Sequence, residues 1–278
     1  MVLDAMDQLP ENSIGITVSH LMYFGGRYEQ IENNKYKSIT LLYFPNEKNK
    51  DNEFYHPEIF ERKADDKFFD RVSKTTNMGT AEKYVLRTIS KNLDRKIYIF
   101  QGTFEEQFFG FLMPYLRPHG LWWEVDLNLG RETDVNSLIK LYELMRNKDV
   151  KYQDLGLKQQ KQDTLVYAVS YNTLGVYLGS VGKYDLAKNY FEKAYKIREQ
   201  GDGVKNSLNL LGEVVELEKK YDDLVLNKDA NTLEDFLLKL HTMKNYRRCT
   251  EVGKELVEIK KTAVNYNNLA SCYLNLGK

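Results

Sequence analysis

The fold of the C-terminal half of this chain is decided by residues 168–201, AVSYNTLGVYLGSVGKYDLAKNYFEKAYKIREQG. Apolar residues recur there at helical spacing, stop at Gly182 and Lys183, and then start again. The two runs contain Tyr171, Leu174 and Leu178, and then Leu186, Tyr190, Phe191, Ala194 and Ile197. They predict two helices joined by a tight turn. Gly175 and Ala187 are small where such helices would come closest, so neither could be enlarged without pushing the helices apart.

The same stretch resembles one unit of the tetratricopeptide repeat. The pattern of that repeat falls on Tyr171, Leu174, Gly175, Leu178, Gly182, Tyr184, Ala187, Phe191, Ala194 and Ile197, and only its late proline is missing. A single unit of this kind cannot bury both of its faces, so stacking neighbours must accompany it in the chain. The resemblance implies a helical scaffold with a protein or peptide partner on its surface.

The helical pattern runs from residue 159 to the end of the sequence, although its units are irregular. Each repeat unit has a first and a second helix, as in residues 168–201. Residues 204–219 predict the first helix of another unit, but residues 221–231 are too short for a regular second helix. Residues 233–259 return to the pattern. Residues 263–278 repeat the spacing of a first helix and stop where a second helix would begin. The repeated positions are Tyr266, Leu269, Ala270, Tyr273 and Gly277. We therefore expect this chain to be truncated at its C-terminus and cut from a longer protein.

Residues 1–130 predict an α/β domain with about four strands in a small, mainly parallel sheet. The strand-like runs are residues 13–19, 39–44, 96–100 and 121–127. Helical runs precede or separate them at residues 3–9, 21–32, 67–73, 82–93 and 104–115. Strands that alternate with helices favour parallel pairing, with helices on the faces of the sheet. Residues 131–158 are predicted to hold a bridging helix and a linker, and residues 159–278 form the repeat domain.

Composition excludes some classes of function. Lys plus Arg and Asp plus Glu both number 40, which removes the electrostatic basis for a general nucleic-acid binder. The start, MVLDAMDQLPENS, lacks the basic region of a secretory signal, and no run of about 18 apolar residues predicts a bilayer span. We expect membrane contact only through a segment upstream of residue 1. Cys249 and Cys272 fit no zinc spacing, and we expect packing thiols rather than a disulfide.

Three short motifs stand out in residues 3–127. They are Leu9, Pro10 and Asn12; Arg95, Ile97 and Tyr98; and Pro114, Tyr115, Leu116, Pro118, Gly120 and Leu121. Together with the order of helices and strands, they resemble the extracytoplasmic C-terminal region of multi-pass, protein O-mannosyltransferase-like membrane proteins of the GT-C glycosyltransferase class. The resemblance implies that the catalytic acid and the lipid-linked sugar site lie in a membrane part outside this chain. That family tends to have an Asp-rich turn after the first strand, where this chain has residues 19–22, SHLM, so an acidic role does not carry over.

Motifs for catalysis, metals or cofactors are weak. The four histidines, His20, His56, His119 and His241, lie far apart and form no HExxH or HxxxH pattern, so we expect no metal site. Residues 179–183, GSVGK, are not a phosphate loop, because Tyr184 replaces the Ser or Thr that binds magnesium. We expect no cofactor and assign no catalytic residue. His20 is a candidate for a pocket, since ligands of open α/β sheets bind beyond the carboxyl ends of the strands. A partly buried loop histidine is the alternative.

Other binding candidates lie on one strand and on the first helices of the repeats. Trp122 and Trp123 would point to opposite faces of a strand, one into the core and the other under the bridging helix or against a sugar. The first helices form the concave surface of such repeats. The candidates for peptide contact there are Asn172, Tyr177, Asn206, Asn209, Asn267 and Asn268. An asparagine amide can clamp an extended backbone because it donates and accepts at once. Solvated helix faces would explain these asparagines as well.

Three hypotheses for function follow. The first is a non-catalytic, extracytoplasmic portion of a membrane GT-C glycosyltransferase-like protein, whose repeats hold acceptor polypeptide or a partner. The second is a free-standing, cytoplasmic adaptor that binds a peptide with its repeats. The third is an α/β enzyme with a site near His20.

Overall fold

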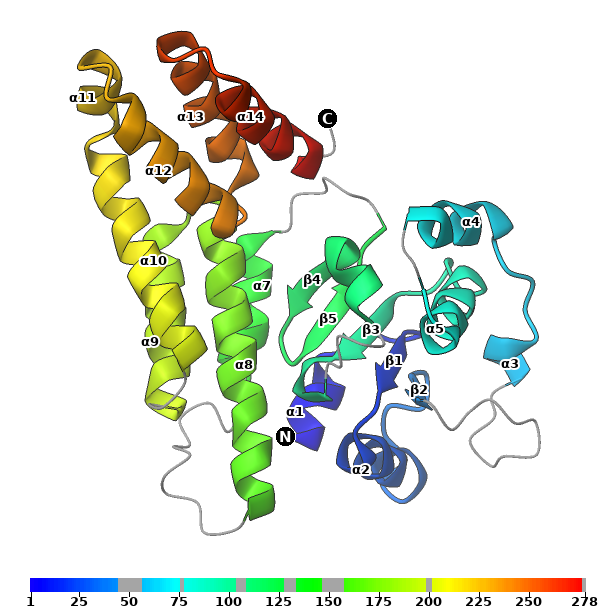
Figure 1. The fold of residues 1–278 in the computed structure, drawn as a ribbon. Coiled ribbons are helices and arrows are strands. Elements are labelled where there is room, and N and C mark those ends of the chain that lie inside the picture. The colour runs from blue at the N-terminus through cyan, green and yellow to red at the C-terminus, as the bar shows by residue number, and fades with distance from the viewer. Residues whose placement is uncertain are drawn as a thin grey trace. The chain divides into compact units, whose positions relative to one another are not determined.

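The computed structural model divides into two compact units. It describes residues 1–44, 57–75, 78–103, 109–127, 134–146, 158–198 and 202–276. Unit 1 comprises Met1–Leu129 with Asn136–Lys148, and unit 2 comprises Gly130–Val135 with Asp149–Lys278. Figure 1 shows the helices and strands of both units. Residues 136–146 therefore pack with unit 1, whereas most of the expected linker lies outside the described residues. The domain boundaries stay a prediction.

Unit 1 is built on a five-stranded mixed sheet in the order β2-β1-β3-β5-β4 (Figure 1). The strands are β1 Ile14–Thr17, β2 Thr40–Tyr43, β3 Ile97–Phe100, β4 Leu116–His119 and β5 Trp122–Val125. β1 is parallel to both β2 and β3, and its Ile14 pairs with Thr40 and with Ile97. β5 is antiparallel to β3 and to β4. The predicted α/β class is confirmed.

Strand β4 is the strand that the sequence pattern does not predict. It contains Pro118, which has no N–H for a ladder hydrogen bond, and it lies at the edge of the sheet, where proline is tolerated. Just before it, residues 110–115 form a 3-10 helix with Pro114 inside, in place of the expected α-helix. Residues 104–108 of that expected helix lie outside the described residues.

Helices cover both faces of the sheet in unit 1. They are α1 Val2–Asp7, α2 His20–Ile31, α3 Pro57–Phe60, α4 Asp66–Thr75, α5 Thr80–Ser90 and α7 Val135–Glu143. One face carries an apolar cluster in which Ile16 and Ile99 pack with Leu86 of α5. On the other face Gly26 of α2 lies against Leu41. Helices thus lie on both faces, as the parallel strands require, although the sheet is mixed rather than mainly parallel because β5 pairs antiparallel with β3 and β4.

The described residues of unit 2 are helical apart from short turns, as predicted. Its helices are α8 Lys158–Ser180, α9 Tyr184–Ile197, α10 Asp202–Lys219, α11 Tyr221–Leu226, α12 Ala230–Thr242, α13 Tyr246–Ile259 and α14 Ala263–Asn275 (Figure 1). Helix α11 has only six residues. The chain turns after it at Lys228, whose φ is +54°, and the Asp229 side chain then caps α12 by accepting from the Thr232 N–H. The expected irregular pair is therefore α10 with α11.

The two cysteines correct an expectation from the sequence. Cys249 of α13 and Cys272 of α14 form a disulfide, with their Cα atoms 5.9 Å apart. The expectation of two packing thiols is wrong, because α14 packs against α13 and brings together residues that are 23 apart in sequence. Spacing along the chain alone does not reveal such a contact.

Candidate partner-binding surface

The α8/α9 pair is the most regular part of unit 2. Its interface buries Tyr171, Leu174 and Leu178 of α8 and Ala187, Phe191 and Ala194 of α9. A Cβ atom at Gly175 would lie 2.6 Å from the Phe191 ring, so only glycine allows the helices to approach this closely. The turn between them contains Gly182, whose φ of +76° favours glycine. Two antiparallel helices, a close glycine contact and a glycine turn together define the pair.

Residues 168–200 match the tetratricopeptide repeat. Tetratricopeptide repeats generally mediate binding to protein partners through an extended concave surface. No curated protein and no solved structure matches the chain. The resemblance of residues 3–127 to the GT-C class is therefore not supported by any relative.

The spacing of the α8/α9 pair recurs in the other helices of unit 2. The second helices α9, α11 and α13 begin at Tyr184, Tyr221 and Tyr246. At equal sequence distance before these tyrosines lie Asn172, Asn209 and Glu234. In α14 the same position is Asn267, because Tyr266 repeats the position of Tyr171. One position of successive first helices thus carries three asparagines and one glutamate.

The first helices are neighbours in the order α8, α10, α12 and α14, so these equivalent positions lie on adjacent helices. Asn206, Asn209 and Asn267 are exposed, whereas Asn172, Tyr177 and Asn268 are half-buried. The Oδ1 atom of Asn172 is buried and has no hydrogen-bond partner among the described residues. The exposed amides that could meet a ligand therefore lie on α10 and α14. The sequence prediction missed Glu234, although its spacing before Tyr246 signals the position.

Lysines compensate the carboxylates of this surface. The Nζ atom of Lys239 lies 2.7 Å from Asp235 and 3.0 Å from Glu213, and these hydrogen bonds raise the pKa of Lys239. The Nζ atom of Lys260 lies 3.8 Å from a carboxylate oxygen of Glu234. Two lysines thus offset most of the charge of these three carboxylates.

The α12/α13 pair packs directly onto the turn of the α8/α9 pair. The Asn245 side chain donates a hydrogen bond of 3.1 Å to the hydroxyl of Tyr184, and Met243 lies against Gly179. Burial raises the pKa of that Tyr184 hydroxyl. Arg248 of α13 pairs with Glu218 of α10 at 2.7 Å and covers the Tyr221 ring. These contacts hold the first helices in place around the short α11.

The candidates in unit 1 lie in separate environments. His20 begins α2 directly after β1, and its Nε2 atom lies 2.6 Å from the hydroxyl of Tyr43 at the end of β2. Trp122 is fully buried, and its indole N–H donates to the Ala5 carbonyl. Trp123 is half-buried against the apolar cluster on the opposite face. The two rings point to opposite faces, as predicted, while a pocket at His20, Trp122 and Trp123 stays a prediction.

The other histidines also take part in structural contacts. The ring Nε2 of His119 donates to the Gln8 carbonyl at 2.8 Å, and burial lowers the pKa of His119. His241 of α12 lies 3.0 Å from the hydroxyl of Ser271 in α14. His56 lies outside the described residues. The described part of the chain contains no group of three or more His, Cys, Asp or Glu side chains that could hold a metal ion.

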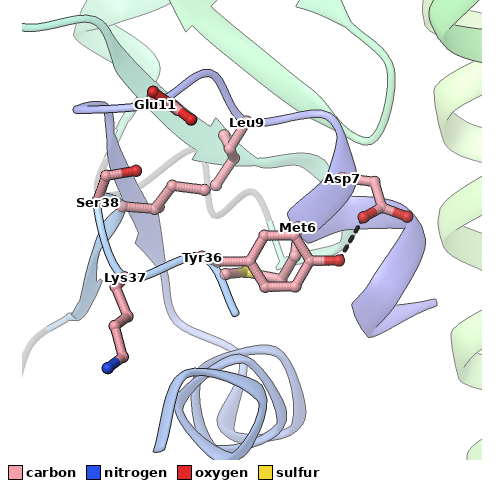
Figure 2. A pocket seen from close by; sticks show the side chains of 8 residues that line it. Met6, Asp7, Leu9, Glu11, Tyr36, Lys37 and Ser38 are labelled. Atoms are coloured by element: carbon pink, nitrogen blue, oxygen red, sulfur yellow. Dashed lines mark hydrogen bonds between the residues drawn. The ribbon is translucent and has the colours of Figure 1, made fainter. Parts of the chain in front are cut away.

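A cavity of about 430 Å³ lies in unit 1 between the end of α1 and residues 36–39. Figure 2 shows Tyr36 reaching across it to the carboxylate of Asp7, to which its hydroxyl donates a hydrogen bond. Burial and this bond raise the pKa of Tyr36 to about 12. Asp7 also pairs with Arg146. Two polar groups of the cavity, Tyr36 and Asp7, are thus engaged with each other, and none of the candidate site residues named from the sequence lines it.

None of the helices in the described part of the chain combines the length and the apolar character that crossing a membrane requires.

Proposed function

We propose that unit 2 is a protein-interaction scaffold that binds an extended polypeptide along its first helices. The observation that carries this proposal is the row of equivalent positions at Asn172, Asn209, Glu234 and Asn267, on neighbouring helices next to a matched tetratricopeptide repeat. Exposed amides on α10 and α14 can each donate to a backbone carbonyl and accept from a backbone N–H of the bound segment. Such contacts recognise the backbone and hold it extended.

The charge pattern narrows the kind of segment that fits. Glu213, Glu234 and Asp235 are each paired with a lysine of unit 2, so no large field of one sign attracts a highly charged peptide. We expect a segment with little net charge and an affinity that changes little with salt concentration.

A peptide display selection against the whole chain tests the proposal. Selected peptides are expected to lose about tenfold in affinity with Asn209→Ala or Asn267→Ala, because each change removes hydrogen bonds worth roughly 1 kcal/mol or more. Asn189→Ala is the matched control, since Asn189 is exposed on the second helix α9. Equal affinities for all three variants would contradict the proposed surface.

A narrower proposal places this scaffold in the extracytoplasmic part of a membrane GT-C glycosyltransferase-like protein. It rests on the motifs of residues 3–127, without a matching relative. The Cys249–Cys272 disulfide favours an oxidising compartment over the cytoplasmic location of a free-standing adaptor. The gene sequence upstream of residue 1 tests this proposal, and an upstream region without transmembrane helices would contradict it.

A further inference from the structure

Two charged side chains at the cavity of unit 1 are left without a partner. The cavity of about 430 Å³ is lined by the end of α1, the loop that follows it and the loop before β2. Among the described residues, Glu11 and Lys37 make no side-chain hydrogen bond or ion pair, although both line the cavity. Asp7, by contrast, is engaged by Tyr36 and Arg146. One carboxylate and one ammonium group of the lining are thus available to a ligand.

The floor of the cavity is apolar. Met6, Leu9 and Ile39 line it, and each of them is at most 6% exposed. Sites for small ligands combine such an apolar lining with a few polar groups that fix the orientation of the ligand, in volumes of about 300–1,000 Å³. The cavity therefore has the size and the lining of a site for a small ligand with an apolar part.

Both loops of the cavity are held by side chains that do not line it. Arg95 donates to the backbone carbonyls of residues 12 and 13, at 2.8 and 3.0 Å. The side-chain amide of Gln30 donates to the carbonyls of Tyr36 and Ile39, at 3.0 and 2.7 Å. It holds Tyr36 at a φ of +53°, a left-handed conformation that is unfavourable for a bulky residue. The walls are thus preformed, whereas the two charged side chains are unpaired.

The positions of the two charges restrict the ligand. Figure 2 shows Glu11 and Lys37 at opposite edges of the lining side chains, with Lys37 pointing away from Glu11. A ligand that pairs with both must carry an ammonium group and a carboxylate at separate ends, with an apolar part between them. A single amino acid lacks this arrangement, because its two charged groups are attached to the same carbon atom. A short peptide with free termini has it, and the flexible stem of a lysine can follow the position of the peptide carboxylate.

We propose that this cavity is a binding site for a short peptide with free termini. Glu11 pairs with the ammonium group of the peptide and Lys37 with its carboxylate, while a central apolar side chain covers Met6, Leu9 and Ile39. Because both charged residues are exposed, each pair contributes little, and the affinity should lie in about the millimolar range. The site belongs to unit 1 and does not depend on the scaffold proposed for unit 2.

Saturation-transfer NMR titration of the full chain with the tripeptide Ala-Leu-Ala tests the proposal. Blocking either end of the peptide, by N-acetylation or by C-amidation, should weaken binding about threefold to fivefold, because one charge pair is lost. Replacing the central leucine by serine should weaken it as well, since the apolar contact with the floor is lost. Absence of Ala-Leu-Ala binding at about ten times the expected dissociation constant would overturn the proposal.

Variants of the two charged residues test whether the pairs are direct. Glu11→Gln should weaken binding of Ala-Leu-Ala and of its C-terminal amide about threefold to fivefold. It should not affect the N-acetylated peptide, which has no ammonium group to pair with. Lys37→Met should show the reverse pattern, with the C-terminal amide unaffected. A variant that changes the binding of all these peptides alike would overturn the assigned pairs.

Two exposed neighbours provide matched controls. Glu32→Gln and Lys35→Met remove the same charges from residues that do not line the cavity, so peptide binding should stay unchanged. Equal losses in these controls would show a general effect of charge and would overturn the site. Asn209→Ala separates this proposal from the scaffold of unit 2. Weaker tripeptide binding in that variant would place the peptide on unit 2 and contradict the cavity site.

Discussion

Gly175 in α8 and Gly212 in α10 occupy the same position in their helices, but their surroundings differ. A Cβ atom at Gly175 would meet the Phe191 ring at 2.6 Å, whereas one at Gly212 would meet nothing within 4 Å. The reason is the partner helix, which has 14 residues in α9 and six in α11. The comparison teaches that a glycine in the repeat pattern is a steric necessity only where a complete second helix covers it.

The α12/α13 pair adds a third version of this contact. The position of Gly175 is taken there by Leu237, and the position of Phe191 is taken by Gly253. A Cβ atom at Gly253 would lie 3.1 Å from Leu237, so the large and small residues have exchanged helices. The volume at the crossing is therefore shared between both helices, and either of them can provide the space.

The largest effect should come from transferring this exchange to the α8/α9 pair. Phe191→Gly should lower the free energy of unfolding of unit 2 by about 4 kcal/mol, because it removes a buried ring and introduces a helical glycine. Gly175→Leu should cost roughly 1–3 kcal/mol through overpacking against Phe191. The double variant should be about 1–3 kcal/mol more stable than the sum of the two single-variant costs predicts. Urea unfolding of all four proteins measures this coupling, and strictly additive costs would contradict the exchange of volumes.

The next effect concerns α14. It corresponds to α8, the first helix of its pair, but no second helix covers it in the described residues. Reduction of the Cys249–Cys272 disulfide should destabilise the end of unit 2 by about 3 kcal/mol, since the bond closes a loop of moderate length. Amide hydrogen exchange should rise in α14 and stay unchanged in the α8/α9 pair. The double variant Cys249→Ala with Cys272→Ala serves as the control, because reductant should then have no effect. Unaltered exchange in reduced α14 would show that packing alone holds this helix.

The smallest effects test the two glycines directly. Gly175→Ala should destabilise unit 2 by about 1–2 kcal/mol, because overpacking against Phe191 exceeds the gain in helix propensity. Gly212→Ala should stabilise it by about 0.5–1 kcal/mol, since its methyl group meets nothing and the propensity gain remains. Thermal unfolding of the two variants beside the wild type compares them. Changes of the same sign would break the contrast between the covered and the open helix.

Much of the local structure could be predicted from the sequence. The periodic apolar residues and the Gly182 turn predict α8 and α9, and the short segment after α10 predicts an irregular partner. The opposite orientation of Trp122 and Trp123 follows from the alternation of side chains along a strand. These features depend on residues close together in the chain, where propensity and periodicity act. Strand β4 escaped prediction because Pro118 argues against a strand unless the strand is known to lie at an edge.

The sequence by itself determined most of the helices and strands, the turn between α8 and α9, and which positions of the repeats correspond. Only the tertiary structure decided that Gly212 is open while Gly175 is covered, that Cys249 meets Cys272, and that Asn245 reaches Tyr184 across the short α11. The physical reason is that a helix forms from interactions within a few residues. Contacts between helices depend on which faces meet, and that in turn depends on the length of every intervening segment.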